Sequence, residues 1–196
     1  MTGERTALET EVRALVSRVL DGVLDGAGTT EPRRADAGDH TGPDGRVAIG
    51  ADHGGFALKQ DLVAKLVEAG WVVDDCGTDS SEACDYPVFA HAVARRVGTG
   101  KCGVGIVVDG AGIGSAMVAN KIPGVRAAAC YDLSTARNSR EHNRANVLTL
   151  GAGLTGPVLA WQIVQEWLAT PWGGDRHMRR VALIREIEDQ YVRVDA

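Results

Sequence analysis

The sequence predicts an α/β fold built around a doubly wound parallel sheet of five strands. Short apolar runs rich in β-branched residues alternate along the chain with longer segments whose apolar residues recur at helical spacing. Turn residues such as Gly70 and Pro87 separate the two kinds of segment. Strands that alternate with helices in this way form a parallel sheet covered by helices on both faces.

Each expected strand is short and is followed by a helix. The strands cover residues 47–50, 71–76, 104–108, 125–130 and 147–151. The helices cover residues 56–69, 87–97, a segment after the glycines at 110–114, 132–143 and 156–169, and a last helix ends near residue 192. We expect residues 46–196 to form one domain that includes this C-terminal helix.

The composition is that of an ordinary globular protein and argues against several classes of partner. Of the 196 residues, 44% are hydrophobic and 24% are charged, and the net charge of −5 predicts no general attraction to nucleic acid or to anionic membranes. No apolar run is long enough to span a bilayer, and the N-terminus has no signal-peptide core. The four cysteines lack CxxC spacing, so we expect reduced thiols in a cytoplasmic protein and no zinc site.

The N-terminal 45 residues differ in character from the rest of the chain. Residues 6–24 carry one apolar stripe at helical spacing, which predicts an amphipathic helix within a module at residues 1–24. Residues 25–45 are rich in Gly, Pro, Asp and Thr and have little to bury, so a disordered linker is expected there. The stripe could dock on the chain's own domain, on a sister subunit or on another protein.

A glycine-rich turn after the third strand is the strongest functional signal. Asp109 stands where the strand ends, and Gly110, Gly112 and Gly114 follow before the next helix. Glycines let a ligand approach the backbone, and free N–H groups at a helix start favour a phosphate or a reaction oxyanion. The same turn could instead serve only to let the helix and the strand pack closely.

Further acids and histidines follow other strands and helices. Asp52 and His53 follow the first strand, and the helix at 132–143 ends in His142 and Asn143. We expect these residues to meet Asp109 in one crevice and to transfer protons there. Alternatively, His53 only caps or packs, and His142 only satisfies a helix C-terminus. His40 and His91 are expected in the linker and on the surface.

A basic cluster opens the last helix. It contains Arg176, His177, Arg179 and Arg180. Guanidinium groups pair well with phosphate, so the cluster predicts an anion site. A solvated or ion-paired helix face is the alternative.

Taken together, the motifs resemble those of the type B ribose-5-phosphate isomerase and galactose-6-phosphate isomerase family over residues 46–190. The matching segments are Gly50–Lys59, Asp85–Pro87, Gly110–Gly114 with Ala119–Lys121, Ser139–Asn143 with Ala145–Val147, and Arg176–Arg180. The resemblance implies a Rossmann-like enzyme that interconverts aldose and ketose phosphates without a metal or an organic cofactor. It implies a homodimer or a dimer of dimers. It also implies that each active site is shared between two subunits.

The resemblance also implies roles for individual residues. His142 would open the sugar ring, and the amides around Gly110, Gly112 and Gly114 would stabilise an oxyanion. The implied sugar contacts are Asp52, His53, Tyr86 and Asn143, and the implied phosphate contacts are Arg176 and Arg180.

Four departures from the family pattern bear on the chemistry. Asp109 stands where many members carry a cysteine base, and Ser115 stands where another branch carries a glutamate base. Ala111 replaces a common threonine, and Gly153 replaces an arginine that helps to hold phosphate. Asp109 could abstract the proton, because carboxylates do this well when partly desolvated. Alternatively, the protein binds a sugar phosphate, or an altered substrate, without ordinary isomerase activity.

The N-terminal module resembles the encapsulation peptides of bacterial microcompartment cargo. Such a helix docks into a groove of a shell protein. A linker of this length reaches roughly 25 Å, which would leave the catalytic domain free. The resemblance therefore implies a cytoplasmic enzyme that can be held inside a microcompartment.

Overall fold

The computed structural model describes residues 45–192. The expected amphipathic helix at 6–24 and nearly all of the expected linker at 25–45 lie outside the described residues. No helix within 45–192 combines the length and the apolar character needed to cross a membrane.

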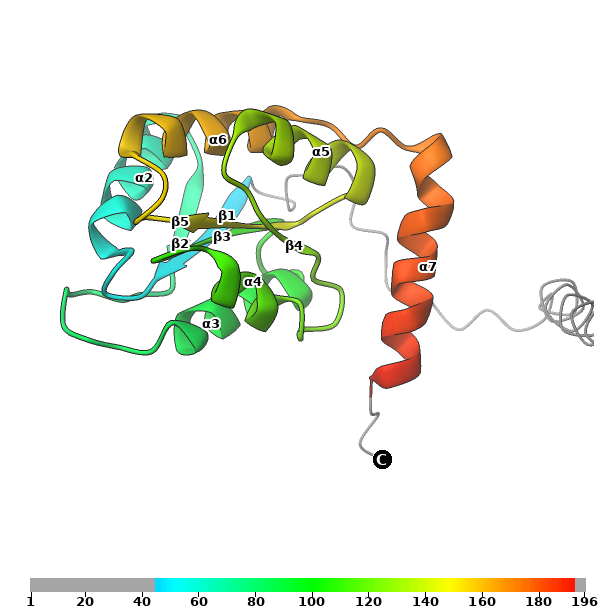
Figure 1. Ribbon diagram of the computed structural model, residues 1–196, viewed down its shortest axis with the longest axis horizontal. Coiled ribbons are helices and arrows are strands. Elements are labelled where there is room, and N and C mark those ends of the chain that lie inside the picture. Colours follow the sequence, from blue (N-terminus) through cyan, green and yellow to red (C-terminus); the bar gives the residue numbers. More distant parts are fainter. Residues whose placement is uncertain (1–44, 193–196) are drawn as a thin grey trace, which may run out of the picture. The chain divides into compact units, whose positions relative to one another are not determined.

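Five parallel strands form one sheet, as the sequence predicts (Figure 1). The strands are β1 (Arg46–Ala51), β2 (Val72–Asp75), β3 (Val104–Asp109), β4 (Ala127–Ala129) and β5 (Val147–Gly151). Their order in the sheet is β2-β1-β3-β5-β4. The chain builds outward from β1 to β2 and then returns to place β3 on the other side of β1. The ends of β1 and β3 therefore flank the point where ligands bind in sheets of this kind.

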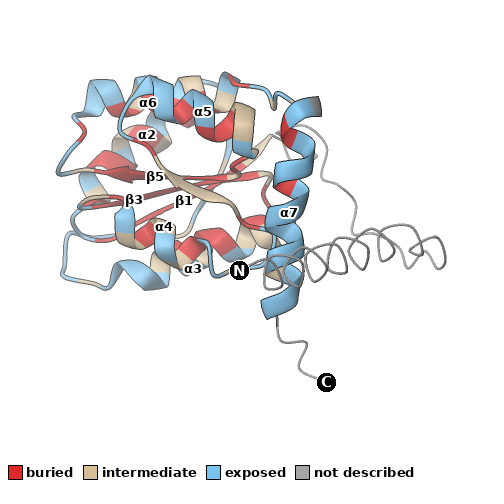
Figure 2. Cartoon of the chain, turned by 45° about the vertical axis from the view of Figure 1, so that its right-hand side comes forward, coloured by how far each residue is buried: buried red, intermediate tan, exposed pale blue. Residues whose placement is uncertain are grey.

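Helices cover both faces of the sheet. In chain order they are α2 (Phe56–Glu68), α3 (Tyr86–Gly98), α4 (Ile113–Ala119), α5 (Leu133–Asn143), α6 (Pro157–Ala169) and α7 (Asp175–Tyr191). Figure 1 shows α2, α5 and α6 on one face and α3 and α4 on the other. Two buried clusters follow from this arrangement, one on each face, with Leu62 and Trp167 in the first and Val93 and Val97 in the second. The central strands are buried almost throughout (Figure 2).

The fourth strand is shorter than the sequence predicts. The apolar run at 125–130 forms only the three residues of β4, which is an edge strand. Before the start of β4, contacts with Asn146 take the place of regular strand pairing. The Asn146 side chain accepts from the Arg126 N–H, and the Asn146 N–H donates to the Arg126 carbonyl. Tertiary contacts of an asparagine therefore set this boundary.

Candidate active site

The ends of β1 and β3 bring two carboxylates together. Ala51 pairs with Val108, so Asp52 and Asp109 follow neighbouring strands at the same level. The Gly55 N–H donates to the Asp52 carboxylate at 2.9 Å, which holds this carboxylate in the turn just before α2. A Cβ on Gly55 would lie 2.2 Å from the Val108 carbonyl oxygen, so only glycine lets α2 begin this close to β3.

Asp109 is buried and is held by four donors. Its Oδ1 accepts from the Ala111 N–H at 2.8 Å and from the Gly112 N–H. Its Oδ2 accepts from the Ser115 N–H at 3.1 Å and from the Ser115 hydroxyl. A carboxylate offers about four acceptor positions, so the resting contacts engage this one fully. Asp109 therefore occupies part of the amide cradle that its own loop creates.

Tyr86 and His53 border the same loop. A Cβ on Gly114 would lie 2.6 to 2.8 Å from two ring atoms and the hydroxyl oxygen of Tyr86, so this side chain rests directly on α4 where glycine leaves room. His53 Nδ1 lies 3.1 Å from both the backbone N and the backbone O of Cys84, in the loop that leads to Tyr86. The structure thus groups Asp52, His53, Tyr86 and Asp109 with the glycine-rich turn at the carboxyl edge of the sheet, where the strands end.

A second group gathers at the amino edge of the sheet, where the strands begin. The His142 ring stacks on the ring of His177, with centroids 4.3 Å apart and planes 15° apart. This stack joins the end of α5 to the start of α7, and within α7 the Arg176 Nε–H donates to His177 Nε2 at 2.8 Å. Arg176 and Arg180 are both exposed and lie one helical turn apart on α7.

The Asn138 side chain orients His142. Its amide nitrogen lies 2.9 Å from His142 Nδ1, and its carbonyl oxygen accepts from the Asn143 side chain at 3.5 Å. With the amide nitrogen donating, a neutral His142 carries its own proton on Nε2. The imidazole is half-buried, and its Nε2 lies 3.7 Å from the Glu141 carboxylate, a distance too long for a hydrogen bond.

The expectation that all these residues meet in one crevice of a single chain is wrong. Helix α5 runs back from the carboxyl edge, so its last residues lie beside the start of β4, where the Asn143 carbonyl accepts from Arg126 Nε at 3.2 Å. Asp109 ends β3, whose six residues span roughly 16 Å. The candidate residues of one chain therefore form two groups on opposite edges of its sheet.

His177 belongs to the amino-edge group but was expected only as a member of the basic cluster. Its side chain is buried, and desolvation lowers its pKa, with further lowering from His142, Arg176 and Arg180. A neutral ring suits stacking against His142. Sequence spacing could not reveal this contact, because 35 residues separate the two histidines and only the docking of α7 on α5 joins them.

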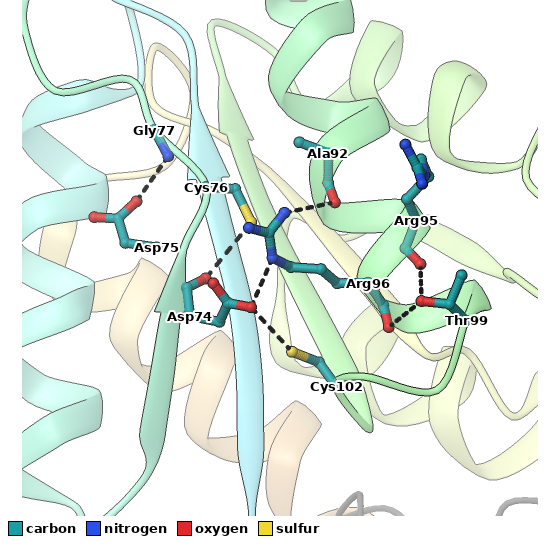
Figure 3. Close-up of polar contacts among 9 residues, drawn as sticks. All are labelled: Asp74, Asp75, Cys76, Gly77, Ala92, Arg95, Arg96, Thr99 and Cys102. Atoms are coloured by element: carbon teal, nitrogen blue, oxygen red, sulfur yellow. Dashed lines mark hydrogen bonds and ion pairs between the residues drawn. The ribbon is translucent and has the colours of Figure 1, made fainter.

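Three cysteines of this chain are poorly suited to act as the base in place of the cysteine that many family members carry at the position of Asp109. Cys76 and Cys102 lie in a cluster with Asp74 and Arg96, whose Nε donates to Asp74 at 2.6 Å (Figure 3). Burial raises the pKa of the Cys76 thiol to about 12 and that of Cys102 to about 11. Burial also raises the pKa of Cys130. These thiols stay protonated near neutral pH and are poor bases.

Gly153 packs on the glycine-rich turn. Its N–H donates to the Gly110 carbonyl at 3.0 Å, and a Cβ at this position would lie 2.9 Å from that oxygen. The β5–α6 loop thus contributes backbone contacts here and no cationic side chain.

Comparisons with known proteins agree on one family. The model of the family described as Ribose/Galactose Isomerase matches residues 47–184. Ribose-5-phosphate isomerase B of Escherichia coli is 45% identical over 145 residues, which cover 74% of this chain and 97% of that protein. The putative sugar phosphate isomerase YwlF of Bacillus subtilis is 38% identical over 146 residues, or 74% of this chain and 98% of that protein.

Solved structures give the same result. Ribose-5-phosphate isomerase B of Clostridium thermocellum has a TM-score of 0.74 and 46% identity, over 74% of this chain and 99% of that one. The enzyme of Mycoplasma genitalium, solved with bound ribulose-5-phosphate, has a TM-score of 0.72 and 34% identity, over 74% of this chain and 97% of that one.

Proposed function

The chain belongs to the ribose/galactose isomerase family and is a sugar-phosphate isomerase, and on that premise we propose that it interconverts an aldose phosphate and its ketose through an enediolate. The expected substrates are ribose 5-phosphate and ribulose 5-phosphate, the pair indicated by the names and titles of its relatives. The observation that carries the mechanism is the grouping of Asp52 and Asp109 with backbone amides at the ends of two neighbouring strands.

The reaction would begin with ring opening at His142. The Nε2–H left by the contact with Asn138 can donate a hydrogen bond to the ring oxygen as the hemiacetal C–O bond breaks. The anomeric hydroxyl loses its proton to solvent as the C1 carbonyl forms, and the ring oxygen gains a proton from solvent. A base then removes the proton from C2 of the open aldose, and the electron pair forms the C1–C2 double bond of the enediolate. Proton delivery to C1 and transfer of a proton from O2 to O1 give the ketose.

We assign the proton transfer at carbon to Asp109. The Ser115 hydroxyl is the donor most easily released from this carboxylate, because it turns about one side-chain bond and the three amides are fixed in the backbone. Its rotation frees one lone pair of Oδ2 for the carbon-bound proton. The amide donors keep the carboxylate in place throughout.

A second copy of the chain would complete each site. The half-site at the carboxyl edge holds the acids, and the half-site at the amino edge holds His142, Arg176 and Arg180, so neither suffices alone. Helix α7 leaves Met178, Ile184 and Ile187 about half exposed, which is the kind of apolar surface that subunits bury. A two-fold dimer places each half-site of one chain opposite the other half-site of its partner.

Proton exchange in heavy water tests this function most directly. We expect the purified protein to incorporate deuterium at carbon from solvent while it converts ribose 5-phosphate to ribulose 5-phosphate. NMR of the sugar reports enediolate formation even when net conversion is slow. Binding of ribose 5-phosphate without exchange or conversion would refute the assignment.

One observation favours binding without turnover as a second candidate function. The Asp109 carboxylate already accepts four hydrogen bonds, and Gly153 supplies no cation to a phosphate. A protein of this kind would bind the sugar phosphate and leave its carbon-bound hydrogens unexchanged. The same experiment therefore separates the two candidates.

Arg176 and Arg180 are proposed to hold the phosphate. We expect Arg180→Ala to raise KM for ribose 5-phosphate by about tenfold to a hundredfold, because a charge-assisted hydrogen bond contributes about 1.5–3 kcal/mol. Arg176→Ala should act similarly and also disturb His177, to which Arg176 donates. The matched control is Arg185→Ala on the same helix, and steady-state kinetics provide the measurement. A similar loss with unphosphorylated ribose would contradict a phosphate contact.

The N-terminal module is proposed to attach the enzyme to a microcompartment shell. Deletion of residues 1–45 should leave dimerisation and turnover intact, because the described domain begins with β1 at Arg46. It should also abolish co-purification with shell proteins on co-expression. Thermal unfolding serves as the control, since a fall in melting temperature on deletion would show that the module packs on its own domain.

A further inference from the structure

Four donors hold the carbonyl groups of Asp109 and the glycine-rich turn, and they come from β5 and from the loops that follow β4 and β5. The Ala152 N–H donates to the Asp109 carbonyl at 2.7 Å, and the Gly153 N–H donates to the Gly110 carbonyl at 3.0 Å. The Tyr131 hydroxyl donates to the Ala111 carbonyl at 3.1 Å. The Thr149 hydroxyl donates to the Gly112 carbonyl at 2.6 Å. Four consecutive carbonyls are therefore held from one side.

Holding a carbonyl also sets the direction of the next amide. The C=O of one residue and the N–H of the next belong to one planar peptide group and point in opposite directions. The bond from Tyr131 thus directs the Gly112 N–H, and the bond from Thr149 directs the Ile113 N–H. In the structure the Gly112 N–H points at the Asp109 carboxylate, which confirms the direction for that peptide.

Two of the four donors are side chains, and they hold the two peptide groups that flank Gly112. Gly112 has a φ of +79°, in the left-handed region, and glycine tolerates alternative orientations of the peptide groups beside it. Ala111 and Gly112 contribute the two carbonyls that Tyr131 and Thr149 hold. Loss of the Thr149 hydroxyl leaves the Gly112 carbonyl with only the longer bond from the Ala116 N–H, at 3.3 Å. Loss of the Tyr131 hydroxyl leaves the peptide group between Ala111 and Gly112 held by the bond from the Gly112 N–H to Asp109. Either loss therefore weakens the restraint on a peptide group next to the most permissive residue of the turn.

We propose that Tyr131 and Thr149 are positioning residues. Tyr131 orients the Gly112 amide toward the Asp109 carboxylate, and Thr149 orients the Ile113 amide toward the reacting oxyanion. The proposal rests on the proposed isomerase function of this turn. Thr149 is completely buried and acts through the Gly112 carbonyl. Tyr131 is 37% exposed, and its hydroxyl acts through the Ala111 carbonyl. Correctly aimed amides stabilise charge that develops in the transition state, so their orientation should affect kcat more than KM.

The test compares Tyr131→Phe and Thr149→Val with matched controls. Thr170→Val removes an equally short hydroxyl bond, 2.7 Å to the Glu166 carbonyl, from a buried threonine far from the turn. Tyr191→Phe removes a hydroxyl from an exposed tyrosine on α7. Thr149→Ser keeps the hydroxyl and serves as the rescue variant.

We expect Tyr131→Phe and Thr149→Val each to lower kcat about tenfold with KM changed less than twofold, a smaller loss than removal of an oxyanion donor. Thr149→Ser should retain most of the activity, and both controls should match the native chain. Loss of kcat in Thr170→Val equal to that in Thr149→Val, or no rescue by serine, would overturn the proposal.

A second readout does not depend on activity. The amide resonances of Gly112 and Ile113 should shift in both variants, and the Gly112 amide should exchange with solvent at least tenfold faster, because its hydrogen bond to Asp109 weakens. Unchanged resonances and exchange would overturn the positioning role. A native chain without isomerase activity would instead refute the proposed function, and the exchange data would still decide the positioning role.

Discussion

Asp109→Asn is expected to lower proton exchange at the sugar carbon by 10²–10⁴-fold, the usual loss when a positioned base is removed. Asparagine preserves the shape of the side chain, but its amide nitrogen cannot accept a proton from carbon. The amide nitrogen is also a donor, so it cannot accept the hydrogen bonds that N–H and hydroxyl groups now donate to Asp109. Deuterium incorporation into ribose 5-phosphate, measured by NMR, gives the rate without requiring net conversion.

Ser115→Ala is the control for this variant. It removes one of the four hydrogen bonds to the carboxylate and leaves the three from backbone amides. If Asp109 is the base, this variant should keep exchange within about tenfold of the native rate, because it frees the lone pair that the reaction needs. Near-native exchange in Asp109→Asn would show that another group removes the proton.

Mixing two inactive variants is expected to restore about a quarter of the native activity. Asp109→Asn damages the half-site at the carboxyl edge, and His142→Asn damages the half-site at the amino edge. When the two variants are refolded together, half of the dimers are mixed, and one of the two sites in each mixed dimer has both halves intact. One active site in two, in half of the dimers, gives one quarter of the native number of active sites.

The double variant Asp109→Asn with His142→Asn provides the control for this mixing. Refolded with the native chain, it should leave about one quarter of the activity if sites are shared and about one half if each chain has its own site. Native mass spectrometry verifies that mixed dimers form. Mixed dimers without recovered activity would contradict the shared site.

Local signals in the sequence sufficed for most of the fold. Residues such as Val104 and Ile106 in β3 and Leu58 and Leu62 in α2 follow the periods of their elements, and each period depends only on backbone geometry. The glycine-rich turn could also be located, since closely spaced glycines after a buried strand are a local feature of the sequence. The family motifs then indicated which chemistry to expect at that turn.

Tertiary structure decided how the site is divided and how its groups are held. Helix α5 is easily predicted, but its direction across the sheet carries His142 to the edge opposite Asp109, which spacing alone does not reveal. The stack of His142 on His177 depends in the same way on the docking of two helices.

The bonds to the glycine-rich turn are the second feature that only folding could show. Thr149 and Tyr131 are 37 and 20 residues distant in sequence from the carbonyls that they hold. A hydroxyl leaves no periodic signal, and its partner depends on which strands become neighbours. The sequence by itself determined the elements and the chemistry available to them, because these are local properties. Folding alone determined which groups face one another, because strand order and helix direction bring together residues that are remote along the chain.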